Sequence, residues 1–224
     1  MSARSKDYIF QENEQGELKF IGDFEGFYQA EDDPWQQSGG SSDIAAYYKY
    51  SRQKIADYIN QYSFQRVLEV GCGVGHSTSQ LAKLIHRGCS GADISQTAVD
   101  KATLNYPHLH FFQLDICQPI QAAETVGKFD CVILNQVLWY IMHAMPEVKQ
   151  NVKSLLAENG LVIFSTAFLK EQRYGQEFFN GYQGFIDYIQ QHWIEDFTIE
   201  HKSYDASNNF DYHDGFICLG LISK

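Results

Sequence analysis

The chain of 224 residues is long enough for one α/β domain with a full hydrophobic core and too short for two domains of usual size. Its 17 basic and 28 acidic residues give a net charge of −11, which opposes binding to a phosphate backbone, so we expect no nucleic acid partner. The first residues lack the apolar core of a signal peptide, and no run approaches the ~18 apolar residues of a membrane span. We therefore expect a soluble, cytoplasmic protein that binds no membrane.

Residues 1–62 are predicted to form an N-terminal helical lid. The region is rich in aromatic side chains, and only some of its residues follow the spacing of one buried helix face: Ile44, Tyr48, Ser51, Ile55 and Tyr58. Ahead of that helix, residues 31–35 place three carboxylates and a tryptophan in a loop. This loop is either a solvated acidic turn around one packed tryptophan or a part of the lid that contacts ligands.

A predicted buried strand at residues 66–70 runs directly into a turn with three glycines at alternate positions, Gly71, Gly73 and Gly75. Glycines there remove the Cβ atoms that would keep a ligand away from the backbone, and they permit positive φ. A dinucleotide-binding fingerprint, G-x-G-x-x-G, needs a third glycine where this chain has His76. The turn indicates a cofactor site of another kind, with an ordinary tight strand-to-helix turn as the alternative.

Further along the chain, short apolar runs alternate with helical patterns, which is typical of βαβ units around a parallel sheet. The predicted strands after the glycine turn are 89–93, 109–114, 129–135, 160–167, 195–204 and 215–222. A polar stretch without a helical pattern joins the last two, so we expect them to form an antiparallel hairpin. The five cysteines lack the spacing of metal ligands, and we expect reduced packing residues and no bound metal.

Four motifs in this order resemble those of the class I S-adenosylmethionine (SAM) methyltransferases. They are E-x-G-x-G-x-G at residues 69–75, acidic residues after the second and third strands, an F-D strand at 129–135, and a helix, glycine turn and strand over 151–166. The resemblance implies an α/β, Rossmann-like, doubly wound sheet of seven strands, mostly parallel with an antiparallel C-terminal hairpin. It also implies SAM as the cofactor and S-adenosylhomocysteine as its product, with residues 63–224 as the SAM-binding domain.

The carboxylate of Asp93, about twenty residues after the glycine turn, can accept hydrogen bonds from both hydroxyls of a ribose. Its alternative is the N-cap of the helix that begins near Gln96, a position that Ser95 can also fill. The resemblance implies that Asp115 contacts the adenine amino group, although Asp115 alone reads as a loop residue. The complete predicted set of cofactor-binding residues is Glu69, Gly71, Cys72, Gly73, Gly75, Asp93, Ile94, Asp115, Ile116, Asn135, Gln136, Arg52 and Tyr48.

A second resemblance is to the nodulation N-methyltransferases, which methylate the free amine of a deacetylated chito-oligosaccharide. It rests on the D-P-W tripeptide at residues 33–35, on Tyr48 and Arg52 four residues apart, and on V-L-W-Y-I at 137–141. The chain departs from that pattern in two ways: a Ser/Gly-rich insert follows residue 37, and Gln136 stands where those proteins tend to have Glu. We carry over the fold and the cofactor from this resemblance, but not the sugar-amine substrate.

Methyl transfer demands little side-chain chemistry, because the sulfonium already activates the methyl group and the enzyme mainly aligns a nucleophile. Tyr140 and His143 are the predicted catalytic residues, with a surface or capping role as the alternative for His143. Asp32 and Asp33 are further candidates for a base. Two more sets complete the expectation: the predicted substrate-binding residues are Tyr28, Trp35 and Tyr140, and the aromatic residues over 174–213 are expected to line part of the acceptor pocket.

The predicted function is methyl transfer from SAM to an amine or hydroxyl of a small polar acceptor, of which a saccharide is one candidate. Two alternatives keep the fold: a SAM-binding protein without transferase activity, and a dinucleotide-binding oxidoreductase. His76 in place of the third glycine opposes the oxidoreductase. We expect a small-molecule acceptor as the only ligand besides the cofactor, and a monomer or homodimer.

Overall fold

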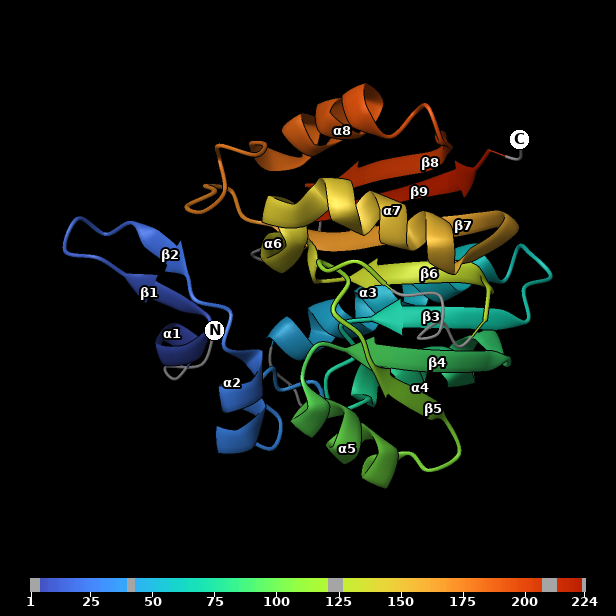
Figure 1. Ribbon diagram of the computed structural model, residues 1–224, viewed down its shortest axis with the longest axis horizontal. Helices are drawn as coiled ribbons and strands as arrows, with labels where there is room; N and C mark the ends of the chain where they lie inside the picture. Colours follow the sequence, from blue (N-terminus) through green and yellow to red (C-terminus); the bar gives the residue numbers. More distant parts are fainter. Residues whose placement is uncertain (1–4, 40–42, 121–126, 207–212, 223–224) are drawn as a thin grey trace.

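The computed structural model describes residues 5–39, 43–120, 127–206 and 213–222. Seven strands form one sheet in the order β5-β4-β3-β6-β7-β9-β8 (Figure 1). Strands β3 to β7 run parallel, and β9 is antiparallel to both of its neighbours. Their bounds are β3 (Arg66–Val70), β4 (Gly88–Asp93), β5 (His110–Gln113), β6 (Phe129–Asn135), β7 (Leu156–Phe168), β8 (Phe197–Asp205) and β9 (His213–Leu221).

This sheet confirms the predicted fold class, including the antiparallel C-terminal hairpin. One boundary differs: β7 begins at Leu156, four residues before the predicted start, because Leu156 already pairs with Phe129. The register between β6 and β7 then shifts before Cys131 pairs with Leu161, and the continuously buried part of β7 begins only after this irregularity. Most of the turn predicted between β8 and β9 lies outside the described residues.

Helices cover both faces of the sheet (Figure 1). Helices α7 (Met145–Leu155) and α8 (Gly181–His192) bury their apolar sides in a core with β3, β6 and β7. On the other face lie α3 (Asp43–Ile59) and α4 (His76–Ile85). Although α3 falls in the predicted lid, its buried side chains pack with those of β3 and β6, so it lies against the sheet. The domain boundary at residues 62 and 63 stays a prediction.

Helix α5 (Gln96–Asn105) packs against β4 and β5. Its N-cap is Ser95, whose Oγ accepts a hydrogen bond from the backbone N–H of Ala98 at 3.0 Å. The cap was one of the two roles considered for Asp93, and the structure gives it to Ser95. Asp93 therefore stays at the carboxyl end of β4, where its carboxylate accepts backbone N–H groups of Gly73 and Ser95.

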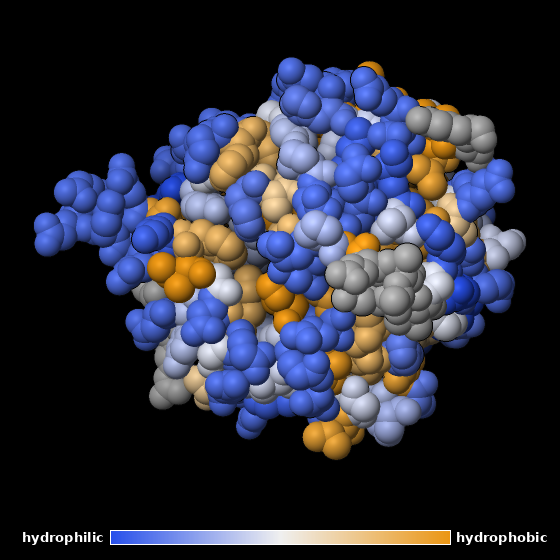
Figure 2. Space-filling model, in the orientation of Figure 1, coloured by the Kyte–Doolittle hydropathy of each residue, from blue (hydrophilic) through white to orange (hydrophobic). Residues whose placement is uncertain are grey.

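The N-terminal unit (Ser5–Ala30) stands apart from the sheet at one side of the molecule (Figure 1). It contains α1 (Ser5–Tyr8), a two-stranded hairpin of β1 (Phe10–Glu12) and β2 (Leu18–Phe20), and α2 (Phe24–Ala30). The sequence predicted a helical lid and missed this hairpin, because strands of three residues are too short to show an alternating pattern. The hairpin projects as a hydrophilic arm in the space-filling view (Figure 2).

Hydrogen bonds from α5 hold both ends of α2. The carboxylate of Glu25 on α2 accepts hydrogen bonds from Ser95 Oγ at 2.7 Å and Thr97 Oγ1 at 2.5 Å, at the N-terminus of α5. These hydroxyl donors lower the pKa of Glu25 to about 2. At the other end of α2, Lys101 Nζ on α5 donates to the carbonyl oxygens of Tyr28 and Glu31. The N-terminal unit is thus held over the carboxyl end of β4.

Among the described residues, no helix combines the length and apolarity needed to cross a bilayer. The five cysteines are free thiols, four of them buried, and no group of three or more metal-ligating side chains occurs in the described part of the chain. Burial raises the pKa of the Cys72 and Cys131 thiols. The four buried cysteines are therefore packing residues, as the sequence indicated.

Candidate functional site

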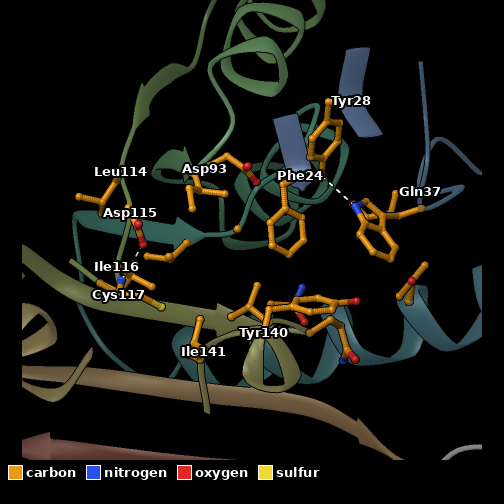
Figure 3. Close-up of a pocket in the computed structure, with 18 residues that line it drawn as sticks. Phe24, Tyr28, Gln37, Asp93, Leu114, Asp115, Ile116, Cys117, Tyr140 and Ile141 are labelled. Carbon is orange, nitrogen blue, oxygen red and sulfur yellow. Dashed lines mark hydrogen bonds between the residues drawn. The ribbon is translucent and has the colours of Figure 1, made fainter. Parts of the chain in front are cut away.

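A pocket lies at the carboxyl ends of the central parallel strands, under α2 (Figure 3). The chain leaves β3 toward β4 on one side and returns as β6 on the other, and ligands of open α/β sheets bind at such a reversal of strand order. This first pocket holds about 820 Å³ of space, counting its open mouth. It is lined by Phe24, Tyr28, Trp35, Gln37, Tyr48, Val70, Gly71, Asp93, Ile94, Leu114, Asp115, Ile116, Cys117, Asn135, Gln136, Val137, Tyr140 and Ile141.

The glycine turn adopts a conformation that other residues rarely can. Gly71, Gly73 and Gly75 have φ of 76°, 53° and 84°. A Cβ on Gly73 would lie 2.6 Å from the hydroxyl oxygen of Tyr28. The turn therefore approaches α2 closely at Gly73 and lines the pocket at Gly71, while Cys72, Gly73 and Gly75 lie behind the wall.

Asp93 is the buried carboxylate of the pocket. Its Oδ2 accepts a hydrogen bond from the backbone N–H of Gly73 at 2.8 Å, and its Oδ1 accepts one from that of Ser95 at 3.0 Å. Burial raises its pKa to about 6, against the opposing effect of these two donors. A carboxylate has about four lone-pair sites, so Asp93 can accept further hydrogen bonds from a ligand in the pocket.

Asp115 and Ile116 follow β5 and line the same side of the pocket as Asp93 (Figure 3). Asp115 Oδ1 accepts a hydrogen bond from the backbone N–H of Cys117 at 2.9 Å, so this residue also shapes the loop, as its alternative reading proposed. Leu114 and Ile94 complete an apolar surface here. A flat ring bound on this side would meet apolar side chains and one acceptor of hydrogen bonds.

Glu69 lies outside the pocket, in a closed hydrogen-bond network. Its carboxylate accepts from Ser77 Oγ at 2.5 Å, from Thr78 Oγ1 at 2.6 Å and from Asn135 Nδ2 at 3.2 Å. The side chain is 1% exposed. Glu69 thus anchors the first turn of α4 and orients Asn135, which itself lines the pocket.

Gln136 has φ of 59°, a left-handed conformation that is uncommon for a residue with a side chain. Its carboxamide is held on both sides: Nε2 donates to Tyr47 Oη at 3.1 Å, and Oε1 accepts from the backbone N–H of Ala167 at 3.0 Å. The backbone N–H of Gln136 also donates to the carbonyl of Ser165. The side chain is therefore fixed at the boundary of the first pocket.

Arg52 is buried beside the first pocket, in a groove between α3 and α4 that meets the pocket at Gln37 and Tyr48. Its Nε donates to Ser77 Oγ at 3.3 Å and its Nη1 to Gln80 Oε1 at 2.6 Å. Nη2 has no hydrogen-bond partner among the described residues. A buried, charged donor without a partner is costly, and an anionic group at this end of the pocket would satisfy it.

The aromatic residues of the N-terminal unit and of the loop after it close the first pocket from above. Trp35 Nε1 donates to Tyr28 Oη at 2.9 Å, the contact that Figure 3 marks with a dashed line. Tyr140 packs against Trp35 with ring centroids 5.7 Å apart and against Phe24 at 5.2 Å. Sequence reasoning missed Phe24, although its position one helical turn before Tyr28 puts both rings on one face.

The two predicted catalytic residues lie in different surroundings. His143 is exposed, lines neither this pocket nor the second pocket described below, and contacts Phe20 with ring centroids 5.8 Å apart. Tyr140 lines both, but burial raises the pKa of its hydroxyl, which therefore keeps its proton at neutral pH. Of the other candidates for a base, Asp33 accepts backbone N–H groups of the loop after Trp35, and Asp32 is solvent-exposed and paired with Lys101.

A second pocket adjoins the first and holds about 1260 Å³, counting its open mouth. Trp35, Tyr48, Gln136 and Tyr140 line both pockets and form the wall between them. The second pocket is bounded in addition by Pro34, Gln36, Ile44, Tyr47, Trp139, Ala167 and Leu169.

Among the described residues, the aromatic side chains predicted over 174–213 line neither of these two pockets, while Phe210 and Tyr212 of that set lie outside the described residues. Phe179 and Phe185 are buried in the core under α8, and Tyr182 stacks on Tyr204 with ring centroids 4.7 Å apart. Most of these rings fill the space between α8 and the antiparallel strands, a packing demand that aromatic content alone does not reveal, and a role of this region in acceptor binding stays a prediction.

The fold and the site together define a class I, Rossmann-like methyltransferase. The chain belongs to a methyltransferase family, since a family model described as a methyltransferase domain matches residues 44–201. The predicted enzyme class is thereby confirmed.

Solved structures of methyltransferases share this fold. The N-methyltransferase NodS from Bradyrhizobium japonicum WM9, in complex with S-adenosylhomocysteine, superposes with a TM-score of 0.65 over 89% of this chain and 100% of that one, at 18% identity. Magnesium protoporphyrin IX methyltransferase (ChlM) from Synechocystis PCC 6803, with bound SAM, gives 0.56 over 85% and 90%, also at 18% identity. With the family membership, these complexes support SAM as the cofactor.

Curated relatives match over about half of this chain. The malonyl-[acyl-carrier protein] O-methyltransferase of Bacillus anthracis is 28% identical over 117 residues, which are 51% of this chain and 39% of that protein. The non-reducing polyketide synthase Preu3 of Preussia isomera is 30% identical over 123 residues, 48% of this chain and 5% of the synthase. The chain thus spans less than half the length of either relative.

Proposed function

We propose that this protein transfers a methyl group from SAM, bound in the first pocket, to an amine or hydroxyl of a small acceptor bound in the second pocket. The observation that carries the proposal is the shared wall: Trp35, Tyr48, Gln136 and Tyr140 line both pockets, so ligands in the two would meet there. Proximity and alignment of the reacting atoms supply most of the catalysis that such a transfer needs.

The residues of the first pocket, together with Arg52 in the adjoining groove, fit SAM from end to end. Asp93 offers carboxylate lone pairs for the ribose hydroxyls, and Asp115 with Ile116 and Leu114 offers an acceptor and an apolar surface for adenine. The unpartnered Nη2 of buried Arg52 fits the methionine carboxylate, and the glycine turn keeps the backbone open at Gly71. When bound, SAM supplies an electrophilic methyl group on a sulfonium.

The residues of the wall align the acceptor and exclude water. Tyr48 and Trp35 present aromatic faces, which stabilise a sulfonium by cation-π attraction. Tyr140 keeps its proton and acts as a hydrogen-bond donor, and we assign it to positioning rather than to proton abstraction. His143 has no place in this proposal, because its ring lies against Phe20 outside both pockets.

Calorimetric titration with SAM, S-adenosylhomocysteine and NAD tests the cofactor assignment. We expect the first two to bind and NAD to give no heat, because His76 occupies the place of the third glycine and its ring is fixed by Tyr106, with Nδ1 and Oη 2.6 Å apart. Binding of NAD alone would favour the oxidoreductase. Binding of SAM without transfer of a radiolabelled methyl group to any amine, phenol or sugar would favour a SAM-binding protein without activity.

A further inference from the structure

The second pocket is uncharged. Among the described residues that line it, none carries a formal charge, in a protein whose net charge is −11. Its walls are the rings of Trp35, Tyr48, Trp139 and Tyr140, together with aliphatic Ile44 and Leu169. A charged group that leaves water for such a surface loses its hydration without gaining an ionic partner, whereas a flat neutral ring gains contact with aromatic faces.

The polar atoms of Tyr47, Gln136 and Trp139 in the second pocket are already hydrogen-bonded within the protein. Tyr47 Oη donates to Asp214 Oδ1 at 3.0 Å and accepts from Gln136 Nε2 at 3.1 Å. Asp214, the carboxylate behind Tyr47, is fully buried and forms an ion pair with Lys54 Nζ at 2.6 Å. Trp139 Nε1 donates to the carbonyl oxygen of Ala167 at 3.0 Å. These side chains hold the shape of the pocket and have little capacity left for a proton from an acceptor.

The same lining contains no general base. Its titratable groups among the described residues are the phenols of Tyr47, Tyr48 and Tyr140, and burial raises the pKa of Tyr47 and of Tyr140. A hydroxyl nucleophile has to lose its proton during attack, and an alkylamine is protonated at neutral pH. A weakly basic nitrogen attached to a ring is neutral at that pH and carries its lone pair without assistance.

Extending the proposed function, we propose that the second pocket accepts an uncharged, ring-bearing molecule and that the methyl group goes to a weakly basic nitrogen on that ring. The nitrogen lone pair forms the N–C bond to the methyl carbon. The S–C bond breaks and its electron pair stays on sulfur, which yields S-adenosylhomocysteine. The nitrogen, now positively charged, loses its N–H proton to water at the open mouth of the pocket.

Three acceptors of nearly equal size test this selectivity. 4-Methylaniline and benzylamine are isomers, the first neutral and the second protonated at neutral pH, and 4-methylphenol replaces the amino group of the first by a hydroxyl. After SAM binding has been established by calorimetry, initial rates are measured by mass spectrometry of the methylated products. We expect 4-methylaniline to react at least about tenfold faster than either of the others, because it alone needs neither desolvation of a charge nor a base.

A pair of variants separates pocket charge from general effects. Leu169 lies on the second pocket and is 46% exposed, so Leu169→Glu adds a carboxylate at its edge without emptying the core. The control variant is Leu104→Glu. Leu104 is 81% exposed on α5 and lines neither pocket. We expect the rate of benzylamine relative to 4-methylaniline to rise about tenfold in the first variant and to stay constant in the second.

The outcomes distinguish this inference from the function on which it rests. If SAM does not bind, the proposed function fails. If SAM binds and benzylamine or 4-methylphenol is methylated as fast as 4-methylaniline, or if none of the three reacts, the inference is overturned while the cofactor assignment stands. An equal change in both variants also contradicts it, since the charge of the second pocket would then not control acceptor choice.

Discussion

Replacement of Asp93 is the most direct test of the cofactor site. The carboxylate is 5% exposed, lines the first pocket and is fixed by the N–H groups of Gly73 and Ser95. Hydrogen bonds to a charged group contribute about 1.5–3 kcal/mol each, so loss of two ribose contacts in Asp93→Ala weakens SAM binding by about 3 kcal/mol at the lower end, or roughly 100-fold in Kd.

Titration calorimetry measures this effect, and two further variants interpret it. Asp93→Asn keeps the volume and one acceptor oxygen, so we expect an intermediate Kd. Asp100→Ala removes an exposed carboxylate from α5 that accepts a hydrogen bond from Gln96 of the same helix at 2.7 Å, and we expect an unchanged Kd. Melting temperatures show whether each variant is folded. A folded Asp93→Ala protein with the affinity of the wild type would refute the assignment of Asp93 to the ribose.

The pH dependence of SAM binding follows from the same carboxylate. Burial raises the pKa of Asp93 to about 6, and donors from the ribose favour the charged form, so SAM binding below pH 6 releases a proton. Affinity is therefore full above the raised pKa and falls as the pH drops through 6, by up to about tenfold per unit. We expect this dependence in the wild type and its loss in Asp93→Asn.

Four further predictions concern other parts of the site. Arg52→Met should weaken SAM roughly 10- to 100-fold, with calorimetric binding of 5′-methylthioadenosine, which lacks the carboxylate, unchanged; equal losses for both ligands would contradict a carboxylate contact. Gly73→Ala should lower the free energy of unfolding by about 1–3 kcal/mol in denaturant titrations, because φ is 53° and Tyr28 Oη stands in the way of the methyl group. Glu25→Gln should speed amide hydrogen exchange across α2. The wild type should approach the variant only as the pH falls from the ordinary pKa of Glu25, 4.5, toward its lowered pKa of about 2. Unchanged exchange in the variant would show that Glu25 does not hold α2 in place. His143→Ala should change the methyl-transfer rate less than about twofold, and a larger loss would return His143 to the mechanism.

Much of the sheet and of the first pocket was predictable from the sequence, because strand ends in a parallel sheet are fixed by local patterns. The apolar runs gave β3 to β6, and the residues that follow such strands meet at one edge. Asp93, Asp115 and Asn135 therefore appear together in the pocket. Glu69 shows the limit of this reasoning. It lies within the E-x-G-x-G-x-G motif, but successive side chains of β3 point to opposite faces, and that of Glu69 contacts Ser77 and Thr78 outside the pocket.

The second pocket was predictable only in part: Trp35 and Tyr140, predicted as substrate-binding residues, line it, but its other walls come from segments far apart in the chain. Trp35, Tyr47 and Trp139 belong to three different segments, and only tertiary packing brings them together with Ala167. Aromatic content pointed instead to α8, whose rings fill the core. A run of aromatic residues at helical spacing satisfies packing and ligand binding equally well, so the pattern does not discriminate between the two.

The hydrogen bonds between α2 and α5 connect the helix that covers the first pocket to the strand end that carries Asp93. Helix α5 begins three residues after Asp93, and its Thr97 and Lys101 hold both ends of α2, which carries Phe24 and Tyr28 over the first pocket. If occupancy of that pocket stabilises the docked position of α2, docking of α2 raises affinity by the same free energy. The residence time of S-adenosylhomocysteine then depends on the contact between α2 and α5, which lies outside the reacting centre. Substitutions in that contact can change the turnover rate while the rate of methyl transfer itself stays the same.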